Sequence, residues 1–220
     1  MLALHSVDVV SIYFNGCELT EVPLELSVLT ALTSVDLTYN SLAGGWQHLR
    51  PPLQLRELKL WGCYLAEVPQ ALSALTALSS LNLGGNYITG GWRHLQPLKQ
   101  LQKLNLASCF LAEVPRELSA LTALSGLVLN GNYITGGWQH LRPLQQLREL
   151  NLGQCRLVEV PLELSALTAL SGLVLNDNEQ LAGGWQHLRP LQQLTQLDLK
   201  HCSLEEVPPE LSMLSAFIEI

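Results

Sequence analysis

Apolar side chains return along this chain in the same order every 23 residues. In each unit they lie eight, five and three residues before a Cys or Asn, and two residues after it. The third unit shows this order with Leu55, Leu58, Leu60, Cys63 and Leu65. The alternation of apolar and outward positions, as over 58–60, predicts a short strand whose apolar side chains share one face. One such strand cannot bury its leucines alone, so the units are expected to stack around a shared core.

Cys and Asn alternate at the key position of nine consecutive units. These residues are Cys17, Asn40, Cys63, Asn86, Cys109, Asn132, Cys155, Asn178 and Cys202. An asparagine side chain can bond main-chain groups in the turn after its strand, including those of a neighbouring unit, whereas a thiol bonds more weakly but suits burial. We therefore predict a structural ladder at this position in which every second member bonds more weakly.

The second half of each unit takes one of two forms. Cys units continue with Glu-Val-Pro, and Pro69, Pro115 and Pro161 are expected to begin short helices, since proline fits a first helical position. Leu72 and Leu75 would then point inward. The true repeat is a pair of units, because residues 63–108 and 109–154 match at 33 of 46 positions.

Asn units continue instead with Gly-Gly-Trp. The two glycines permit a tight turn, and Trp92 and Leu95 are expected to cover the core from the convex side. The segment Asp177–Ala182 contains one residue more than its equivalents, so it should bulge locally.

The full pattern, L-x-x-L-x-L-x-x-N/C-x-L, occurs nine times between residue 9 and about residue 216. It resembles the leucine-rich repeat, and the Cys form is similar to the 23-residue repeats of intracellular Ras-pathway scaffolds. The resemblance implies an α/β fold, a right-handed solenoid or horseshoe with a concave parallel β-sheet and short convex helices. It also implies one domain over residues 1–220 and non-enzymatic protein binding by the concave surface. The Gly-Gly-Trp form departs from the family pattern, so no specific partner is carried over.

Candidate binding residues lie where the concave positions are least uniform. The middle units carry small or bland side chains there, whereas the first three units and the last one carry aromatic and charged residues, which are typical of interface hot spots. An isolated surface tryptophan can also have no function. The candidates are Tyr13, Asn15, Asp36, Tyr39, Lys59, Trp61, Asp198, Lys200 and His201.

Aromatic residues also follow the key position in four consecutive units: Tyr64, Tyr87, Phe110 and Tyr133. At one strand spacing these rings should form a stripe along one rim of the solenoid. The stripe has two interpretations, a packing ladder or a protein-binding rim.

Charge and composition exclude several classes of partner. The chain has 12 Lys and Arg against 19 Asp and Glu, a net charge of −7, which argues against nucleic acid. No apolar stretch approaches the ~20 residues that span a bilayer, so no membrane is expected as partner. One periodic acidic series, which we interpret as a solvated outer face, consists of Glu21, Glu67, Glu113, Glu159 and Glu206.

The five cysteines are an odd number at nearly equal spacing, which is not a disulfide framework. Cysteines of alternate units would lie about 10 Å apart, beyond the reach of a disulfide. We therefore predict that all five are reduced and buried, which favours a cytosolic or nuclear setting and a cytoplasmic localisation.

No pattern indicates a metal, cofactor or catalytic site. His48, His94, His140 and His187 recur two residues after each tryptophan, but two units apart, too far for one metal ion to join them. The run from Asp198 to Cys202 places its cysteine at a buried ladder position, away from any base in a cleft. We expect no enzyme activity.

The two ends show no polar cap of the kind that solenoids need. Met1–Asp8 matches the tail of an Asn unit, and Phe217, Ile218 and Ile220 fit the start of a tenth strand. Open sheet edges at Val9–Phe14 and at the last strands would fray, continue in a longer array, or associate end to end. Two further interpretations of the whole chain stay open: a designed or excised module without a natural ligand, and the recognition arm of a larger enzyme.

Overall fold

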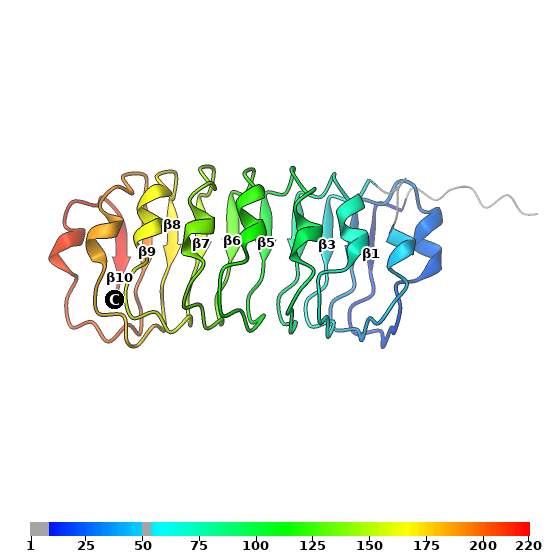
Figure 1. The fold of residues 1–220 in the computed structure, drawn as a ribbon, viewed down its shortest axis with the longest axis horizontal. Helices are drawn as coiled ribbons and strands as arrows, with labels where there is room; N and C mark the ends of the chain where they lie inside the picture. Colours follow the sequence, from blue (N-terminus) through cyan, green and yellow to red (C-terminus); the bar gives the residue numbers. More distant parts are fainter. Residues whose placement is uncertain (1–8, 50–53) are drawn as a thin grey trace, which may run out of the picture.

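The computed structural model describes residues 9–49 and 54–220, and its ten strands in this part form one parallel sheet (Figure 1). Each strand pairs with the next along the chain, so the order in the sheet is the order in the sequence. The strands are β1 (Ser11–Tyr13), β2 (Ser34–Asp36), β3 (Glu57–Lys59), β4 (Ser80–Asn82), β5 (Lys103–Asn105), β6 (Gly126–Val128), β7 (Glu149–Asn151), β8 (Gly172–Val174), β9 (Gln196–Asp198) and β10 (Phe217–Glu219). The predicted open α/β solenoid is confirmed.

A single helical turn follows each strand from β1 to β9 and forms a layer beside the sheet (Figure 1). All of these turns are tight 3₁₀ helices, so the predicted short helices are confirmed. The prolines, however, precede them: Pro69, Pro115 and Pro161 lie one residue before the first helical position, with extended backbone. The helices are η1 (Leu24–Val28), η2 (Trp46–Leu49), η3 (Gln70–Ala74), η4 (Trp92–Leu95), η5 (Arg116–Ala120), η6 (Trp138–Leu141), η7 (Leu162–Ala166), η8 (Trp185–Leu188) and η9 (Pro209–Leu211).

One continuous core fills the space between the two layers. Each 23-residue unit, here called a rung, contributes its leucines in register, as where Leu58 pairs with Leu81 across β3 and β4. Leu72, Leu75 and Leu95 are buried, as predicted, and Trp92 packs partly buried against the same core. The core therefore runs the length of the molecule instead of forming one globular centre.

The asparagine of each Asn rung bonds main-chain groups of the Cys rung before it and of its own turn. Asn86 Oδ1 accepts from the main-chain N–H groups of Cys63 (2.9 Å) and Leu65 (3.0 Å), while its Nδ2 donates to the Leu60 carbonyl oxygen (2.8 Å). Tyr64, between the two donors, has a left-handed backbone (φ 57°), which turns both N–H groups toward one acceptor. The predicted asparagine ladder is confirmed, and it joins one particular pair of neighbours.

A second contact closes the same junction on the helical side. Glu67 and Gly90 form an isolated parallel bridge, and equivalent bridges recur once in each of four pairs of rungs. Gly91 has φ 77°, and a Cβ there would lie 2.5 Å from the Val68 carbonyl oxygen. Only glycine fits this approach of the two backbones. We call the junction from a Cys rung to the following Asn rung the tight seam.

The junction from an Asn rung to the following Cys rung has fewer bonds. Here the ladder contribution is a single thiol bond, from Cys109 Sγ to the Leu83 carbonyl oxygen (3.2 Å). The four isolated bridges of the described residues all lie on tight seams. We call this junction the loose seam, and the two kinds alternate along the solenoid.

The extra residue after Asn178 is absorbed locally, as predicted. The β8–β9 register shifts to 24 residues, with Gly172 opposite Gln196, and the Leu181 N–H closes a turn onto the Asn178 carbonyl oxygen (2.9 Å). At β10 the register contracts instead: Ile218 lies opposite Leu197, and Phe217 is exposed. A tenth strand is thus present, but it is displaced relative to the repeat.

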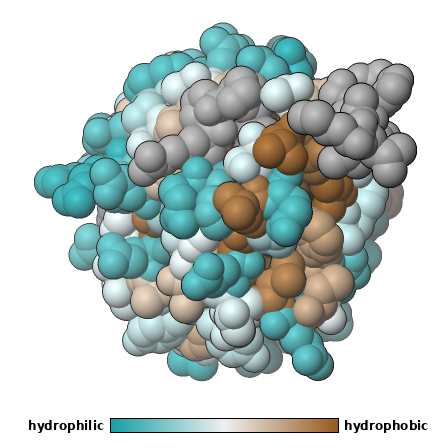
Figure 2. Space-filling model, turned by 90° about the vertical axis from the view of Figure 1, so that its right-hand side faces the viewer, coloured by the Kyte–Doolittle hydropathy of each residue, from teal (hydrophilic) through white to brown (hydrophobic). Residues whose placement is uncertain are grey.

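Figure 2 looks at the end of the solenoid that carries β1 and shows apolar surface there. Val10, Leu24 and Val28 are exposed, and Ile12 and Phe14 are only partly buried. The interpretation of Met1–Asp8 as part of a rung lies outside the described residues, and end-to-end association stays a prediction.

One prediction about the cysteines is wrong. Cys17 is exposed, whereas Cys63, Cys109, Cys155 and Cys202 are buried. The buried thiols donate to a carbonyl of the preceding rung, while the Cys17 thiol contacts only the Asn15 carbonyl oxygen within its own turn. Cys17 lies in the first rung of the described residues, and no other described rung precedes it.

Candidate functional site

The first three strands carry a group of exposed aromatic side chains on the concave face. Tyr13 on β1 and Tyr39 after β2 each retain 65% of their surface, and Asn15 is also exposed. Trp61 follows β3 and is partly exposed. These side chains project from adjacent rungs of one rigid sheet, so they form a continuous surface.

Two of these rings lie against glycines of the next rung. A Cβ on Gly62 would be 2.9 Å from Tyr39 Cδ1, and a Cβ on Gly84 would be 2.2 Å from Trp61 Cζ3. Each aromatic residue precedes its glycine by 23 positions, which is one rung. The glycines therefore leave the space that the rings occupy. A glycine 23 residues after an aromatic residue is the sequence signal that could have revealed this contact.

The charged members of the group are bonded within the sheet. Asp36 Oδ1 accepts from the Thr38 N–H (3.0 Å), closing the turn after β2. Lys59 Nζ lies 3.5 Å from Glu57 Oε1, and Glu57 accepts from the Ser34 hydroxyl (3.0 Å). Asp36 thus has a structural role that is not evident from the sequence, and Lys59 is a partly exposed cation paired with Glu57.

The same turn-closing bond explains the bland middle of the concave face. The side chains of Asn82, Asn105 and Asn151, which end their strands, each accept from the N–H two residues ahead, at 2.8–3.0 Å. Their side-chain oxygens are therefore committed to turns. The binding candidates are confined to the two ends of the sheet.

At the C-terminal end, the charged rung is neutralised by the last strand. Lys200 pairs with Glu219 of β10, and the hydrogen bond and charge of this carboxylate raise the pKa of the lysine ammonium. Asp198 Oδ1 accepts from the Lys200 N–H (3.0 Å), as at the other strand ends. His201 is exposed in a left-handed conformation (φ 58°). The three candidates lie together, but Lys200 is paired with Glu219 and Asp198 accepts a main-chain hydrogen bond.

The four rim aromatics are exposed, with ring contacts along only part of the series. Tyr87 and Phe110 lie with ring centroids 5.3 Å apart, and the Arg156 guanidinium lies 4.1 Å from the centre of the Tyr133 ring. Tyr64 is 82% exposed. Beside Tyr133 and Arg156, a polar hollow extends to Asp177 and Glu179 of the inserted loop. The last of the rim aromatics and the inserted loop therefore line the same hollow.

The buried thiols and the histidines have structural surroundings. Burial raises the pKa of Cys109 and Cys155 from 9.0 to about 11, which keeps them protonated and unreactive at neutral pH. His48 Nδ1 lies 2.8 Å from the Val22 carbonyl oxygen of the preceding rung, and His187 bonds Val160 in the same way. Within the described residues, no group of three or more His, Cys, Asp or Glu side chains could hold a metal ion. No helix of that part is long and apolar enough to cross a membrane.

Comparison with known proteins agrees with this architecture. A family model described as leucine-rich repeat matches residues 54–111, and a second one matches residues 193–214. The chain is a leucine-rich-repeat protein. No curated protein sequence matches it. The narrower resemblance to Ras-pathway scaffolds stays a prediction, since neither model description names them.

Solved leucine-rich-repeat structures share the fold over nearly the whole chain. A Leptospira interrogans leucine-rich-repeat protein superposes with a TM-score of 0.69 and 26% identity, over 95% of this chain and 60% of its own. Internalin C2 of Listeria monocytogenes gives 0.65 and 20%, over 96% and 80% of the two chains. The leucine-rich-repeat domain of the type III effector XopL gives 0.75 and 22%, over 95% and 75%. The chain spans less than two thirds of the Leptospira protein.

Proposed function

We propose that this leucine-rich-repeat protein binds a protein partner, without catalysing a reaction, through the concave surface of its first three rungs. The observation that supports the proposal is the pair of aromatic rings, Tyr39 and Trp61, held over glycines while still partly exposed. A ring fixed before binding loses little conformational freedom when a partner covers it. Exposed Tyr13 and Asn15 extend the surface toward β1, and Lys59 supplies a charge beside the rings.

The surrounding chemistry favours this function over catalysis. The buried thiols have raised pKa values, and the acidic side chains at the strand ends accept main-chain bonds. The free cysteines of the described residues are compatible with a reducing compartment, so we also infer a cytoplasmic localisation. In a longer protein the same surface would serve as a recognition arm, which makes the sequence of neighbouring domains the best discriminator between these roles.

The test is Trp61→Ala, measured by calorimetry against a partner purified on the wild-type chain. Removing a hot-spot tryptophan is expected to weaken binding by about 2 kcal/mol or more. Circular dichroism and urea unfolding would establish that the variant keeps its fold. A folded variant that retains full affinity would remove this surface from consideration.

A matched pair of glycine variants tests the fixed orientation itself. Gly84→Ala places a methyl group 2.2 Å from the present position of Trp61 Cζ3, so the indole must move, whereas at Gly90 a Cβ meets nothing within 4 Å. We expect Gly84→Ala to weaken binding and Gly90→Ala to leave it unchanged. Equal affinities for the two variants would show that the orientation of the ring does not matter.

A further inference from the structure

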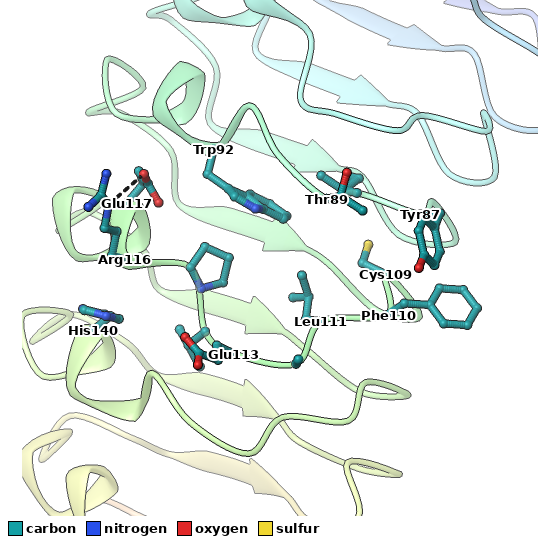
Figure 3. Close-up of a pocket in the computed structure, with 14 residues that line it drawn as sticks. Tyr87, Thr89, Trp92, Cys109, Phe110, Leu111, Glu113, Arg116, Glu117 and His140 are labelled. Carbon is teal, nitrogen blue, oxygen red and sulfur yellow. Dashed lines mark hydrogen bonds and ion pairs between the residues drawn. The ribbon is translucent and has the colours of Figure 1, made fainter.

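A groove on the helical side of the molecule occurs in two successive pairs of rungs, and Trp138, Glu159 and His187 hold the equivalent positions in the next pair. In one copy the Trp92 indole and the His140 imidazole stand on either side of the segment Glu113–Pro115 (Figure 3). A second copy has Trp46, the segment Glu67–Pro69 and His94 in the same places. In each copy the Glu-Val-Pro segment of a Cys rung lies between the Gly-Gly-Trp turns of two Asn rungs.

The alternation of seams produces this groove. A tight seam is closed on the helical side by its bridge, such as that between Glu113 and Gly136. The loose seam has no such bridge in the described residues, and the tryptophan of the preceding rung occupies the gap instead. Trp46, Trp92 and Trp138 remain partly exposed there, whereas Trp185 is buried. Each groove therefore offers an apolar ring to a ligand.

Acidic side chains accompany the rings at the same period. Glu67, Glu113 and Glu159 are exposed, and within residues 9–49 and 54–220 their carboxylates have no ion-pair partner. In the groove at Trp92 the neighbouring cation Arg116 is held by Glu117 (3.2 Å), whereas the groove at Trp46 is also lined by the exposed Arg93. A carboxylate beside a tryptophan ring is suited to a guanidinium or ammonium group, which is attracted by both.

The spacing of the grooves narrows the ligand further. Successive grooves are two rungs apart; alternate strands of the sheet are about 10 Å apart, and we take this value as the spacing of the grooves. One turn of a polyproline II helix contains three residues and rises about 9 Å. An extended strand has a two-residue period of roughly 7 Å and would fall out of step with the grooves.

We propose that the grooves bind a proline-rich peptide in the polyproline II conformation, with an arginine or lysine at every third position. Its cations would reach Glu67, Glu113 and Glu159, and its prolines would pack on Trp46, Trp92 and Trp138. The conformation is already ordered in the free peptide, which reduces the entropy lost on binding, and aromatic grooves are its usual receptors. The acidic net charge of −7 attracts such a ligand at low salt.

The test measures fluorescence anisotropy of a labelled (Pro-Pro-Arg)₄ peptide with the full chain at low ionic strength. A peptide of the same composition with its four arginines adjacent is the control, because it keeps the charge but lacks the three-residue period. Replacing all three groove glutamates, as Glu67→Gln, Glu113→Gln and Glu159→Gln together, is expected to weaken binding of the periodic peptide about tenfold. Glu18, Glu179 and Glu205 are also exposed but lie outside the grooves, so their joint change to Gln is the matched control and should cost less than about twofold.

Three outcomes would overturn the proposal. The first is absence of binding by the periodic peptide, and the second is equal affinity for the two peptides. The third is an equal loss in the two triple variants, which would indicate attraction to the net charge alone.

A further variant separates this inference from the proposed concave function. Trp61→Ala changes the concave surface and no groove residue, so it should leave the affinity for the periodic peptide unchanged. If that substitution abolished peptide binding, the peptide would lie on the concave face and the groove assignment would be wrong. Failure of the groove test alone leaves the concave proposal intact.

Discussion

The two kinds of seam join the same leucine core but differ in their polar contacts. Across a tight seam, Asn132 Oδ1 accepts from the N–H groups of Cys109 and Leu111, both at 3.0 Å, and Glu113 bridges Gly136. Across the loose seam, the ladder supplies one thiol bond. The leucine pattern is identical in every rung, so the polar positions decide which neighbours are held most strongly.

This difference shows why the alternation of Cys and Asn is not a neutral substitution. The asparagine satisfies two buried N–H donors that no main-chain carbonyl reaches, whereas the cysteine satisfies only a carbonyl oxygen. In the described residues no buried side-chain polar atom lacks a partner, so the arrangement is complete as it stands. The following substitutions and conditions would break or sharpen the contrast.

The largest effect is expected from Asn132→Ala. The change leaves the N–H groups of Cys109 and Leu111 buried without an acceptor, which should lower the free energy of unfolding by about 1–3 kcal/mol. Urea denaturation followed by circular dichroism measures it. A loss smaller than about 0.5 kcal/mol would contradict the ladder role of this asparagine.

Alkaline pH should weaken the loose seams in particular. The pKa of Cys109 and of Cys155 is about 11 in the folded protein against 9.0 as the reference, so unfolded chains lose these protons first. Stability from these thiols is therefore complete below pH 9 and falls as the pH rises toward 11, by about 1 kcal/mol for each thiol at pH 10.

Unfolding free energies at pH 8 and pH 10 test this, with Cys109→Ser/Cys155→Ser as the control. Lysines and tyrosines titrate in both proteins, but the variant lacks the two thiols, so its stability should depend less steeply on pH. Identical slopes would show that the thiols do not contribute.

The smallest effect is expected from Cys109→Ser alone. A serine hydroxyl can donate to the Leu83 carbonyl as the thiol does, and no N–H depends on this side chain. The loss should be about 1 kcal/mol or less. Asn132→Ser is the matched comparison, because it creates the same residue on the tight seam and should cost more; the reverse order would mean that the seams are wrongly ranked.

The sequence predicted the architecture well because its signals are local and repeated. The spacing of Leu58, Leu60 and Leu83 decides which side chains are buried, and nine copies of the pattern leave no alternative stacking. The sequence could not show which neighbouring rung each asparagine bonds. Asn86 has a rung on either side, and it bonds mainly the one before it. That choice depends on the left-handed turn at Tyr64, which is not evident from a tyrosine in the sequence.

The candidate site was predicted in position but not in detail. Tyr13, Tyr39 and Trp61 lie on the concave face, yet the glycines beneath the last two were read as bland. Asp36 and Asp198 were selected for their charge, although both close turns through their side chains. Cys17 was assigned to the buried ladder by analogy with its equivalents, but a ladder position is buried only when another rung precedes it. In each case the role of the residue depends on its contacts with other residues of the fold. Comparing the residues at one repeat position along the sequence does not show those contacts.

The seam alternation has a consequence for how the length of such a protein can change. Deleting one Asn rung would place two Cys rungs in contact, and the two N–H donors now bonded by its asparagine would face a thiol that offers no comparable acceptor. Deleting one Cys rung would instead place two Asn rungs in contact, where the equivalent donors would face an amide oxygen. Loss of a single Asn rung is therefore expected to be rarer than loss of a Cys rung or of a complete pair of rungs, which shortens the sheet by about 10 Å. Among chains built this way, junctions between two Cys rungs should be the rare ones.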